Sequence, residues 1–386
     1  MVIRKISYYR VIVSLCLFMF LLSPVFGDEI SAVSFDKELP ENNIVTIQPD
    51  SLRILHNPLT GWVLYASMGV DAADFWAQYD HMYIPELGHN VSVTDYAHTL
   101  YIRASWTDFN PQEDVYGWKI DSNLRAYIEG AYQRNMRLAF RVVVDSRDKR
   151  TEFTPQFVKD AGAKGFMNKG KWSPYSDDSV FQKYYTKFVK ALAKDFNDPS
   201  KVEFIDGFGL GKWGEYHTMI YSTGDDTPKK AVFDWVTDIY SQAFDKVPVV
   251  INYHRWIGAG KDWVDDEHFA ADSEEMLEEA IKKGYSLRHD AFGMTTYYGS
   301  WERRFAKKYR NICPIIMEGG WIVKSHSYWQ DPRGYRKDSH EDVRRGEFDD
   351  SKEAHVNMMD FRFGDTESWF KDAFDLVRRF LREGGY

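Results

Sequence analysis

The stretch that decides the fold of this chain is Phe204-Ile-Asp-Gly-Phe-Gly-Leu-Gly-Lys-Trp-Gly-Glu-Tyr-His217. Its first residues belong to a short apolar run, residues 202–205, which is typical of a buried strand. Closely spaced glycines follow, and the turn then presents a cation, an aromatic ring and an acid in Lys212, Trp213 and Glu215. A buried strand that ends in such a turn indicates either the edge of an active site or a solvated strand end. The first interpretation requires that the rest of the chain supply a partner for Glu215.

The same alternation recurs along the chain, because short apolar runs are followed by stretches with apolar residues at helical spacing. The expected strands cover residues 62–66, 99–106, 137–144, 202–205, 247–252, 291–296, 313–318 and 354–360. The expected helices cover residues 121–134, 179–196, 229–244, 273–283, 301–309 and 367–382. Long loops are expected over residues 107–118 and 148–178, and residues 72–83 are either a helix or a loop.

Alternating strands and helices are typical of an α/β fold. The count of eight favours a single (β/α)8 TIM barrel over an open doubly wound sheet. At 386 residues the chain is long enough for two domains or for one large barrel. The barrel is expected to occupy residues 51–386, which leaves no room for a second folded domain. No GxGxxG motif follows the first strand, so a dinucleotide-binding fold lacks its signature.

The first 27 residues are expected to be a secretory signal peptide, and residues 28–50 an N-terminal extension. Basic residues precede an apolar core over residues 11–22, and small residues stand before residue 28. The core is short for a membrane span, with an uncleaved anchor as the alternative. Removing the leader takes away Arg4, Lys5 and Arg10, so the formal charge moves from −9 to −12.

Such an acidic protein is not expected to bind nucleic acid or an anionic membrane surface. Cys313 is the one cysteine beyond the leader, so no intramolecular disulfide is expected in the cleaved chain. An exported chain of this kind indicates the bacterial periplasm or cell envelope.

In a (β/α)8 barrel the carboxyl ends of all the strands meet on one face, where catalytic residues lie. Glu318, in Ile315-Ile-Met-Glu-Gly-Gly-Trp321, ends the seventh strand and is the partner that Glu215 requires. The two glutamates, after the fourth and seventh strands, are expected to face each other across the barrel. Glycoside hydrolysis requires such a pair, since one carboxyl protonates the leaving oxygen while the other attacks or stabilises the anomeric carbon.

Aromatic and polar residues at the other strand ends also favour a carbohydrate site, because Trp and Tyr rings suit stacking on sugars. The candidate substrate-binding residues are Arg103, Trp106, Asp145, Trp213, His217, Asn252, Tyr253, His254, Tyr297 and Trp321. No cofactor is expected. The acidic and histidine candidates lack the HxH or HExxH spacing of a metal site, and the GxSxG motif of serine hydrolases is absent from the sequence.

Residues 103–118 (RASWTDFNPQEDVYGW) resemble the R..W...P..G.Y.W stretch of the clan of retaining glycoside hydrolases with (β/α)8 barrels. The resemblance covers roughly residues 57–383, and it implies that Glu215 is the acid/base and Glu318 the nucleophile. One departure matters. Most of the clan has Asn before the acid/base to hold the sugar 2-hydroxyl, whereas this chain has Gly214. That contact is then expected from Asn252 or His217.

The sequence therefore predicts an exported glycoside hydrolase that cleaves a β-linked oligo- or polysaccharide by a retaining two-carboxylate mechanism. Two alternatives stay open at this point. One is a catalytically silent carbohydrate-binding barrel of the cell envelope. The other is an inverting glycosidase, which needs a carboxyl separation well beyond about 5.5 Å.

Overall fold

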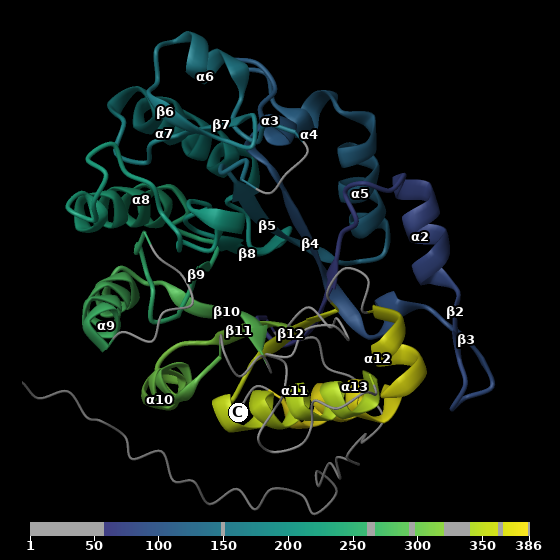
Figure 1. Ribbon diagram of the computed structural model, residues 1–386. Coiled ribbons are helices and arrows are strands. Elements are labelled where there is room, and N and C mark those ends of the chain that lie inside the picture. The colour runs from purple at the N-terminus through teal and green to yellow at the C-terminus, as the bar shows by residue number, and fades with distance from the viewer. Residues whose placement is uncertain are drawn as a thin grey trace, which may run out of the picture. The chain divides into compact units, whose positions relative to one another are not determined.

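The computed structural model describes residues 58–147, 151–260, 267–292, 298–319, 340–361 and 366–384. Eight parallel strands close into a barrel in the order β1-β12-β11-β10-β9-β8-β5-β4 (Figure 1). They are β1 Gly61–Tyr65, β4 Ala97–Ser105, β5 Arg137–Val143, β8 Val202–Asp206, β9 Val249–Asn252, β10 Ser286–Phe292, β11 Ile315–Gly319 and β12 Met358–Phe361. The predicted (β/α)8 barrel is confirmed.

Helices lie around the outside of the barrel (Figure 1). They are α2 Ala72–Asp80, α5 Ser122–Gln133, α7 Ser179–Phe196, α8 Lys229–Ala243, α9 Glu267–Lys282, α10 Ser300–Tyr309, α11 His340–Ala354, α12 Thr366–Asp372 and α13 Phe374–Glu383. Aspartates cap α2, α5 and α7, because Asp71, Asp121 and Asp178 each accept a hydrogen bond from a main-chain N–H of the first turn. In the part of the chain that is described, no helix is both long and apolar enough to span a membrane.

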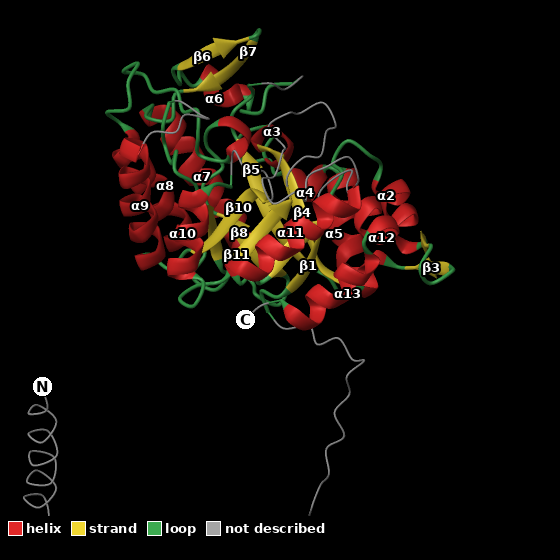
Figure 2. Ribbon diagram, turned by 60° about the horizontal axis from the view of Figure 1, so that its bottom comes forward, coloured by secondary structure: helices red, strands yellow, loops and turns green. Residues whose placement is uncertain are grey.

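Several small elements lie in the connections between barrel strands and helices. The short helices are α3 Trp106–Phe109, α4 Gly117–Ile120 and α6 Gln156–Asp160, and the 3-10 turns are η2 Val93–Asp95 and η3 Lys212–Gly214. Two antiparallel hairpins pair β2 Met82–Ile84 with β3 His89–Val91, and β6 Gly165–Asn168 with β7 Lys171–Pro174. The second hairpin falls within a predicted loop and rises above one end of the barrel (Figure 2).

Two strand predictions were wrong in position. The sixth strand was expected over 291–296, but β10 begins five residues earlier, because its polar residues Arg288 and Asp290 point into the barrel and interrupt the apolar run. The eighth strand was expected from residue 354, whereas Ala354 ends α11 and β12 begins at Met358. The closing helix predicted over 367–382 is divided into α12 and α13.

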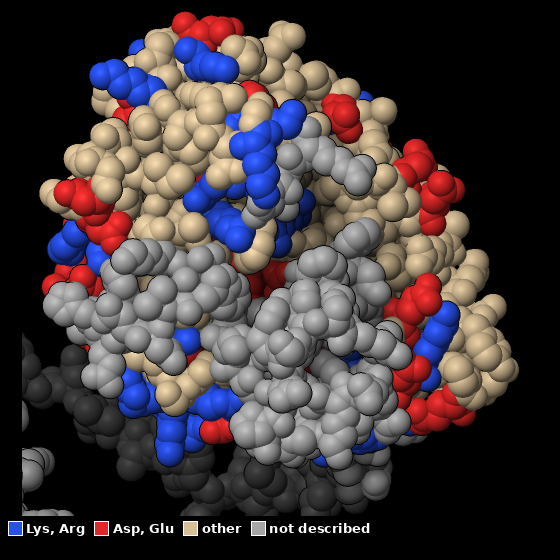
Figure 3. Space-filling view, viewed as in Figure 1, with Lys and Arg blue, Asp and Glu red and all other residues tan. Residues whose placement is uncertain are grey.

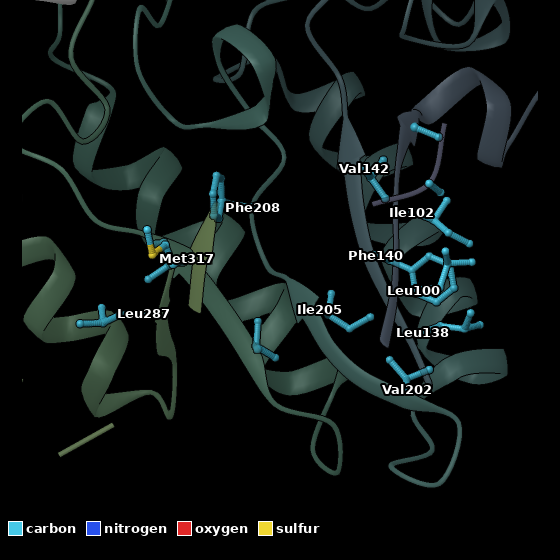
Figure 4. Packing of buried hydrophobic residues seen from close by; sticks show 14 of the residues in the cluster. Leu100, Ile102, Leu138, Phe140, Val142, Val202, Ile205, Phe208, Leu287 and Met317 are labelled. Carbon is cyan, nitrogen blue, oxygen red and sulfur yellow. The ribbon is translucent and has the colours of Figure 1, made fainter. Parts of the chain in front are cut away.

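The outward-facing residues of the strands form the main core with the surrounding helices. Figure 4 shows Leu100, Ile102, Leu138, Phe140 and Val142 of β4 and β5 packed together, all of them buried. Alternate residues of a strand point to opposite faces, so the residues between these point into the barrel.

Inside the barrel, the inward-facing residues form two sets. The apolar set consists of Val63, Ala139, Phe204, Val250, Ile316 and Met358, which pack against one another. The charged set, closer to the carboxyl ends of the strands, consists of Arg103, Arg141, Asp206, Arg288, Asp290, Glu318 and Asp360. On β5, β8, β11 and β12 the charged residue follows the apolar one by two positions, as the pleat of a strand requires.

Candidate active site

The carboxyl ends of the strands carry the charged set and surround a hollow in the surface. Figure 3 views this end of the barrel: acidic atoms lie at the base of the hollow and basic side chains along the described part of its edge. Glu215 and Glu318 are 6% and 2% exposed. Charged side chains that are buried this deeply require partners, so the site is best understood through its ion pairs.

Two fully buried arginines organise the charged set. Arg141 donates from Nε to Asp206 Oδ2 at 2.8 Å and from Nη2 to both oxygens of Asp290 at 3.0 and 2.8 Å. Arg288 donates from Nη2 to Glu318 Oε2 at 2.7 Å. Its Nε lies 3.3 Å from Asp206 and 3.2 Å from Asp290. Two guanidinium groups thereby connect carboxyl groups from three strands, which suits the fixed fork geometry of arginine.

The carboxylate of Glu318 is held by Arg288 of β10 and lies near Tyr65 at the end of β1. Burial raises the pKa of Tyr65 to about 12, with the positive charge of Arg103 opposing this rise and the negative charge of Glu318 adding to it. Arg103 donates from Nη1 to the Tyr65 hydroxyl at 3.3 Å. Tyr65 therefore keeps its proton and presents a neutral hydroxyl beside Glu318.

Glu215 lies in the connection after β8 and contacts two arginines and a histidine. Its Oε1 is 3.7 Å from Arg103 Nη2 and 3.7 Å from Arg141 Nη1, and its Oε2 is 3.2 Å from His217 Nε2. Burial raises the pKa of Glu215, but the hydrogen bond from His217 and the charge of Arg103 outweigh burial and hold this pKa below its usual value. Glu215 is thus stabilised as a carboxylate.

The backbone around Glu215 adopts a rare conformation. Trp213, Tyr216 and Thr218 have φ values of +59°, +59° and +52°, in the left-handed region that side chains other than glycine seldom adopt. A Cβ added to Gly209 would lie 2.1 Å from the carbonyl oxygen of Val142. Left-handed residues other than glycine cost about 1–3 kcal/mol each and cluster at functional sites. The glycines between β8 and Glu215 therefore allow the unusual backbone conformation that positions Glu215.

Two histidines contact Glu215, one at its main-chain carbonyl oxygen and one at its carboxyl group. His254 has its Nε2 2.7 Å from the carbonyl oxygen of Glu215, and its Nδ1 accepts from the main-chain N–H of Trp256 at 3.1 Å. Burial and the neighbouring His217 hold the pKa of His254 well below its usual value, so the ring is neutral and its Nε2–H donates. His217 has its Nδ1 2.8 Å from the Thr218 hydroxyl, which leaves its Nε2–H to donate to Glu215.

Five of the predicted substrate-binding residues lie among these groups: Arg103, Trp213, His217, Asn252 and His254. Trp213 is partly buried, its carbonyl oxygen accepts from Arg103 Nη2 at 2.6 Å, and Lys212 Nζ lies 4.3 Å above its ring. Asn252 points into the barrel but contacts Asp290, to which its Nδ2 donates at 3.1 Å. The expected contact between Asn252 and a sugar hydroxyl would compete with this bond.

Three other predicted residues are packed against or hydrogen-bonded to protein groups. Trp106 is fully buried and packs against Phe181 and Tyr185 of α7, so its ring has no free face for a sugar. Tyr253 stacks on Phe305 of α10, behind the strand. Asp145 accepts from the main-chain N–H and Nε of Arg147 at 2.9 and 2.7 Å. Tyr297 and Trp321 lie outside the described residues.

The sequence reasoning missed several residues of the site, namely Tyr65, Arg141, Asp206, Arg288, Asp290 and Asp360. A charge within an otherwise apolar strand was the available signal, since Arg141 interrupts the run over 137–144 and Asp206 ends the run at 202–205. Arg288 and Asp290 were missed because β10 was placed too late in the chain. Within the described ranges, no three His, Cys, Asp or Glu side chains are grouped as a metal ion would require.

No family model matches the chain, and no curated protein matches it. Among solved structures, an exo-β-1,4-mannosidase from Opitutaceae bacterium strain TAV5 is 13% identical with a TM-score of 0.47, over 84% of this chain and 59% of the mannosidase. An intracellular xylanase from Thermoanaerobacterium saccharolyticum is 8% identical with a TM-score of 0.44, over 78% and 85% of the two chains. Endo-glycoceramidase II from Rhodococcus sp. is 13% identical with a TM-score of 0.49, over 82% and 78%. Likeness at this level does not establish an activity, which has to be argued from the site.

Proposed function

We propose that this protein is a glycoside hydrolase that cleaves a β-linked oligo- or polysaccharide with retention of configuration. The observation that carries the proposal is the pair Glu215 and Glu318. They follow or end β8 and β11, three strands apart around the closed barrel, and the charges of Arg103 and Arg141 act on both. Two carboxyl groups that share cations across a hollow suit chemistry on a glycosidic bond.

In this mechanism the Glu318 carboxylate attacks the anomeric carbon as the bond to the leaving oxygen breaks, and Glu215 in its acid form gives its proton to that oxygen. A glycosyl ester of Glu318 results. Water then attacks the same carbon, Glu215 takes up the proton of that water, and Glu318 leaves as a carboxylate. The hydrogen bond from Arg288 holds the Glu318 carboxylate in position for the first step.

Substrate contacts come from the edge of the hollow. Trp213 lies two residues before Glu215 in the chain, and its partial exposure suits stacking on a sugar. Tyr65 presents a neutral hydroxyl beside Glu318 and would donate to a sugar hydroxyl or ring oxygen. The leader predicted over residues 1–27 supports export to the periplasm or cell envelope, where such a glycan would be met.

A catalytically silent carbohydrate-binding barrel is the second candidate, and the lowered pKa of Glu215 favours it. A proton donor has to hold its proton, whereas His217 and Arg103 stabilise the ionised form of this carboxyl. The glycosidase proposal accommodates this through an acidic pH optimum, because Glu215 is protonated below its lowered pKa.

The test compares Glu215→Gln and Glu318→Gln with Glu203→Gln, assayed on aryl β-glycosides and on polysaccharides. Glu203 is equally buried, but lies near the start of β8 and pairs with Arg137. Loss of the proton donor is expected to slow turnover between about a hundredfold and ten-thousandfold. The Glu318 variant is expected to lose turnover altogether, and the Glu203 variant to retain it.

NMR of the first-formed anomer distinguishes retention from inversion. Glycan binding without turnover in the wild type, unchanged in both site variants, would instead establish the silent binding barrel.

A further inference from the structure

Asp360, at the end of β12, shares one nitrogen of Arg288 with Glu318. Arg288 Nη2 lies 2.7 Å from Glu318 Oε2 and 3.1 Å from Asp360 Oδ2. Asp360 is 2% exposed, and its second oxygen, Oδ1, has no hydrogen-bond partner among the described residues. Two buried carboxyl groups therefore lie side by side on a single guanidinium nitrogen.

Among the described residues, carboxyl groups outnumber guanidinium groups at the strand ends. The described residues supply five carboxyl groups and three guanidinium groups; these belong to Asp206, Glu215, Asp290, Glu318 and Asp360, and to Arg103, Arg141 and Arg288. Even a charged His217 on Glu215 would leave one carboxylate in excess. Because burying an unpaired charge is costly, at least one of the five is expected to hold a proton.

Asp360 is held less closely by the two buried arginines than Asp206, Asp290 and Glu318 are. Asp206 receives hydrogen bonds from Arg141 and from the Tyr101 hydroxyl. Asp290 receives two from Arg141 and one from Asn252. Asp360 receives one, at 3.1 Å, from a nitrogen that lies closer to Glu318. The proton is therefore best placed on Asp360.

We propose that Asp360 holds a proton and forms an acid–carboxylate pair with Glu318 on Arg288, as a positioning residue for the nucleophile. The pair rests on the geometry alone, and its catalytic meaning rests on the proposed glycosidase function. With Asp360 neutral, Glu318 is the one anion on Arg288 Nη2, so the nucleophile keeps this hydrogen bond without repulsion from a second charge. When two carboxyl groups lie close together, the pKa of one is raised, and this separates the roles of the two acids.

The groups that face Asp360 act in opposite directions. Burial and the negative charge of Glu318 raise the pKa of Asp360 well above 3.8, with a smaller contribution from Asp290, while Arg288 lowers it. The ring of Tyr101 also forms a cation–π contact with Arg288, with the guanidinium carbon 4.5 Å from the ring centroid. These groups come from β4, β10 and β11, so the inferred proton depends on the closed barrel.

This arrangement sets the sign of a stability effect. In the unfolded chain Asp360 ionises near pH 3.8, whereas in the folded protein it stays protonated to a higher pH. Protonated Asp360 therefore makes its full contribution to folding stability below pH 3.8. That contribution is progressively lost as the pH rises towards the pKa of Asp360 in the folded protein. An asparagine has the same shape as the protonated acid and does not titrate, so Asp360→Asn removes this loss.

The experiment measures melting temperature against pH for the wild type, Asp360→Asn and the matched control Asp290→Asn, without any substrate. At neutral pH we expect Asp360→Asn to equal or exceed the wild type, with a margin that grows as the pH rises above 3.8. Asp290→Asn should be less stable than the wild type because it loses its charge-assisted bonds to Arg141. A destabilised or unfolded Asp360→Asn, or a margin that does not change with pH, overturns the inferred proton.

A second readout tests the positioning role on the glycosidase. Turnover by Asp360→Asn should exceed that of Asp360→Ala at the pH optimum, because asparagine keeps the shape of the protonated acid beside Glu318. The kcat of Asp360→Asn should also fall less than that of the wild type at alkaline pH, where ionised Asp360 would repel Glu318. A loss of kcat as large as that of Glu318→Gln overturns the positioning role. If no glycoside is hydrolysed at all, the melting curves still decide whether Asp360 holds a proton, so the two failures are distinguishable.

Discussion

The apolar set and the charged set of the barrel interior lie on the same strands, two residues apart, yet burial affects the folding free energy of the two sets in opposite directions. Ile316 is followed by Glu318 on β11, and Met358 by Asp360 on β12. The apolar set gains free energy by leaving water, at roughly 25 cal/mol per Å² of buried apolar surface. The charged set has to recover the large cost of desolvating its ions from its own pairing. The charged set at this end of the barrel is therefore better explained by a functional role than by a contribution to folding stability.

The strongest test of this difference is to remove Arg288, a cation that pairs with several carboxyl groups of the charged set. Arg288→Met fills similar volume but leaves Glu318, Asp206 and Asp290 with one fewer guanidinium. We expect a loss of about 3–5 kcal/mol in the free energy of unfolding, because an uncompensated buried charge remains. Urea denaturation measures this loss.

The control for that experiment is Arg125→Met, since Arg125 forms an exposed pair with Glu129 one turn along α5. Exposed pairs of this kind contribute about 0.3–0.5 kcal/mol. If Arg288→Met were as stable as the Arg125 variant, the charged set would not depend on Arg288 for its balance.

A smaller change tests Glu215, the other carboxyl group of the proposed pair. His217→Phe keeps a ring in the buried position but removes the hydrogen bond that lowers the pKa of Glu215. The pKa of Glu215 should then rise, so the fall of kcat/KM with increasing pH should move to higher pH. The pH profile of kcat/KM on an aryl glycoside measures this shift.

Thr218→Val is the matched variant for His217→Phe, because it removes the contact at Nδ1 and leaves the bond from Nε2 to Glu215. Its pH profile should stay close to that of the wild type. An unmoved profile in His217→Phe would show that His217 does not control the proton of Glu215.

The smallest effect is expected in the apolar set. Ile316→Val removes one methylene group from a fully buried side chain. This should cost about 0.5–1.5 kcal/mol of unfolding free energy and leave kcat unchanged, since Ile316 belongs to the apolar set, two residues before Glu318. A large loss of kcat in this variant would mean that the two sets are coupled and not merely adjacent.

Much of the barrel could be predicted from local patterns. Six of the eight strands fall where apolar runs end in turns, and α7 has the predicted bounds because Asp178 caps it and apolar residues recur along one face. Glu215 and Glu318 could be predicted for the same reason, since each follows such a run. The β6–β7 hairpin could not, because its residues have no strong alternation and it is stabilised by contacts beyond its own sequence, such as the bond from the N–H of Ser146 to Ser173 Oγ.

The position of β10 marks where local patterns stop being informative. Ser286-Leu-Arg-His-Asp-Ala-Phe292 looks too polar for a central strand, because an isolated strand with Arg288 and Asp290 would bury two unpaired charges. In the closed barrel those charges meet partners from β5, β8, β11 and β12.

By itself, the sequence determined the number of strands and the two glutamates at their ends, because apolar periodicity and glycine turns are local properties. Tertiary structure alone decided that Arg288 holds Glu318, that Asp360 shares that cation, and that Trp106 faces the core. These depend on which inward positions of distant strands become neighbours when the sheet closes, and no local pattern contains that information.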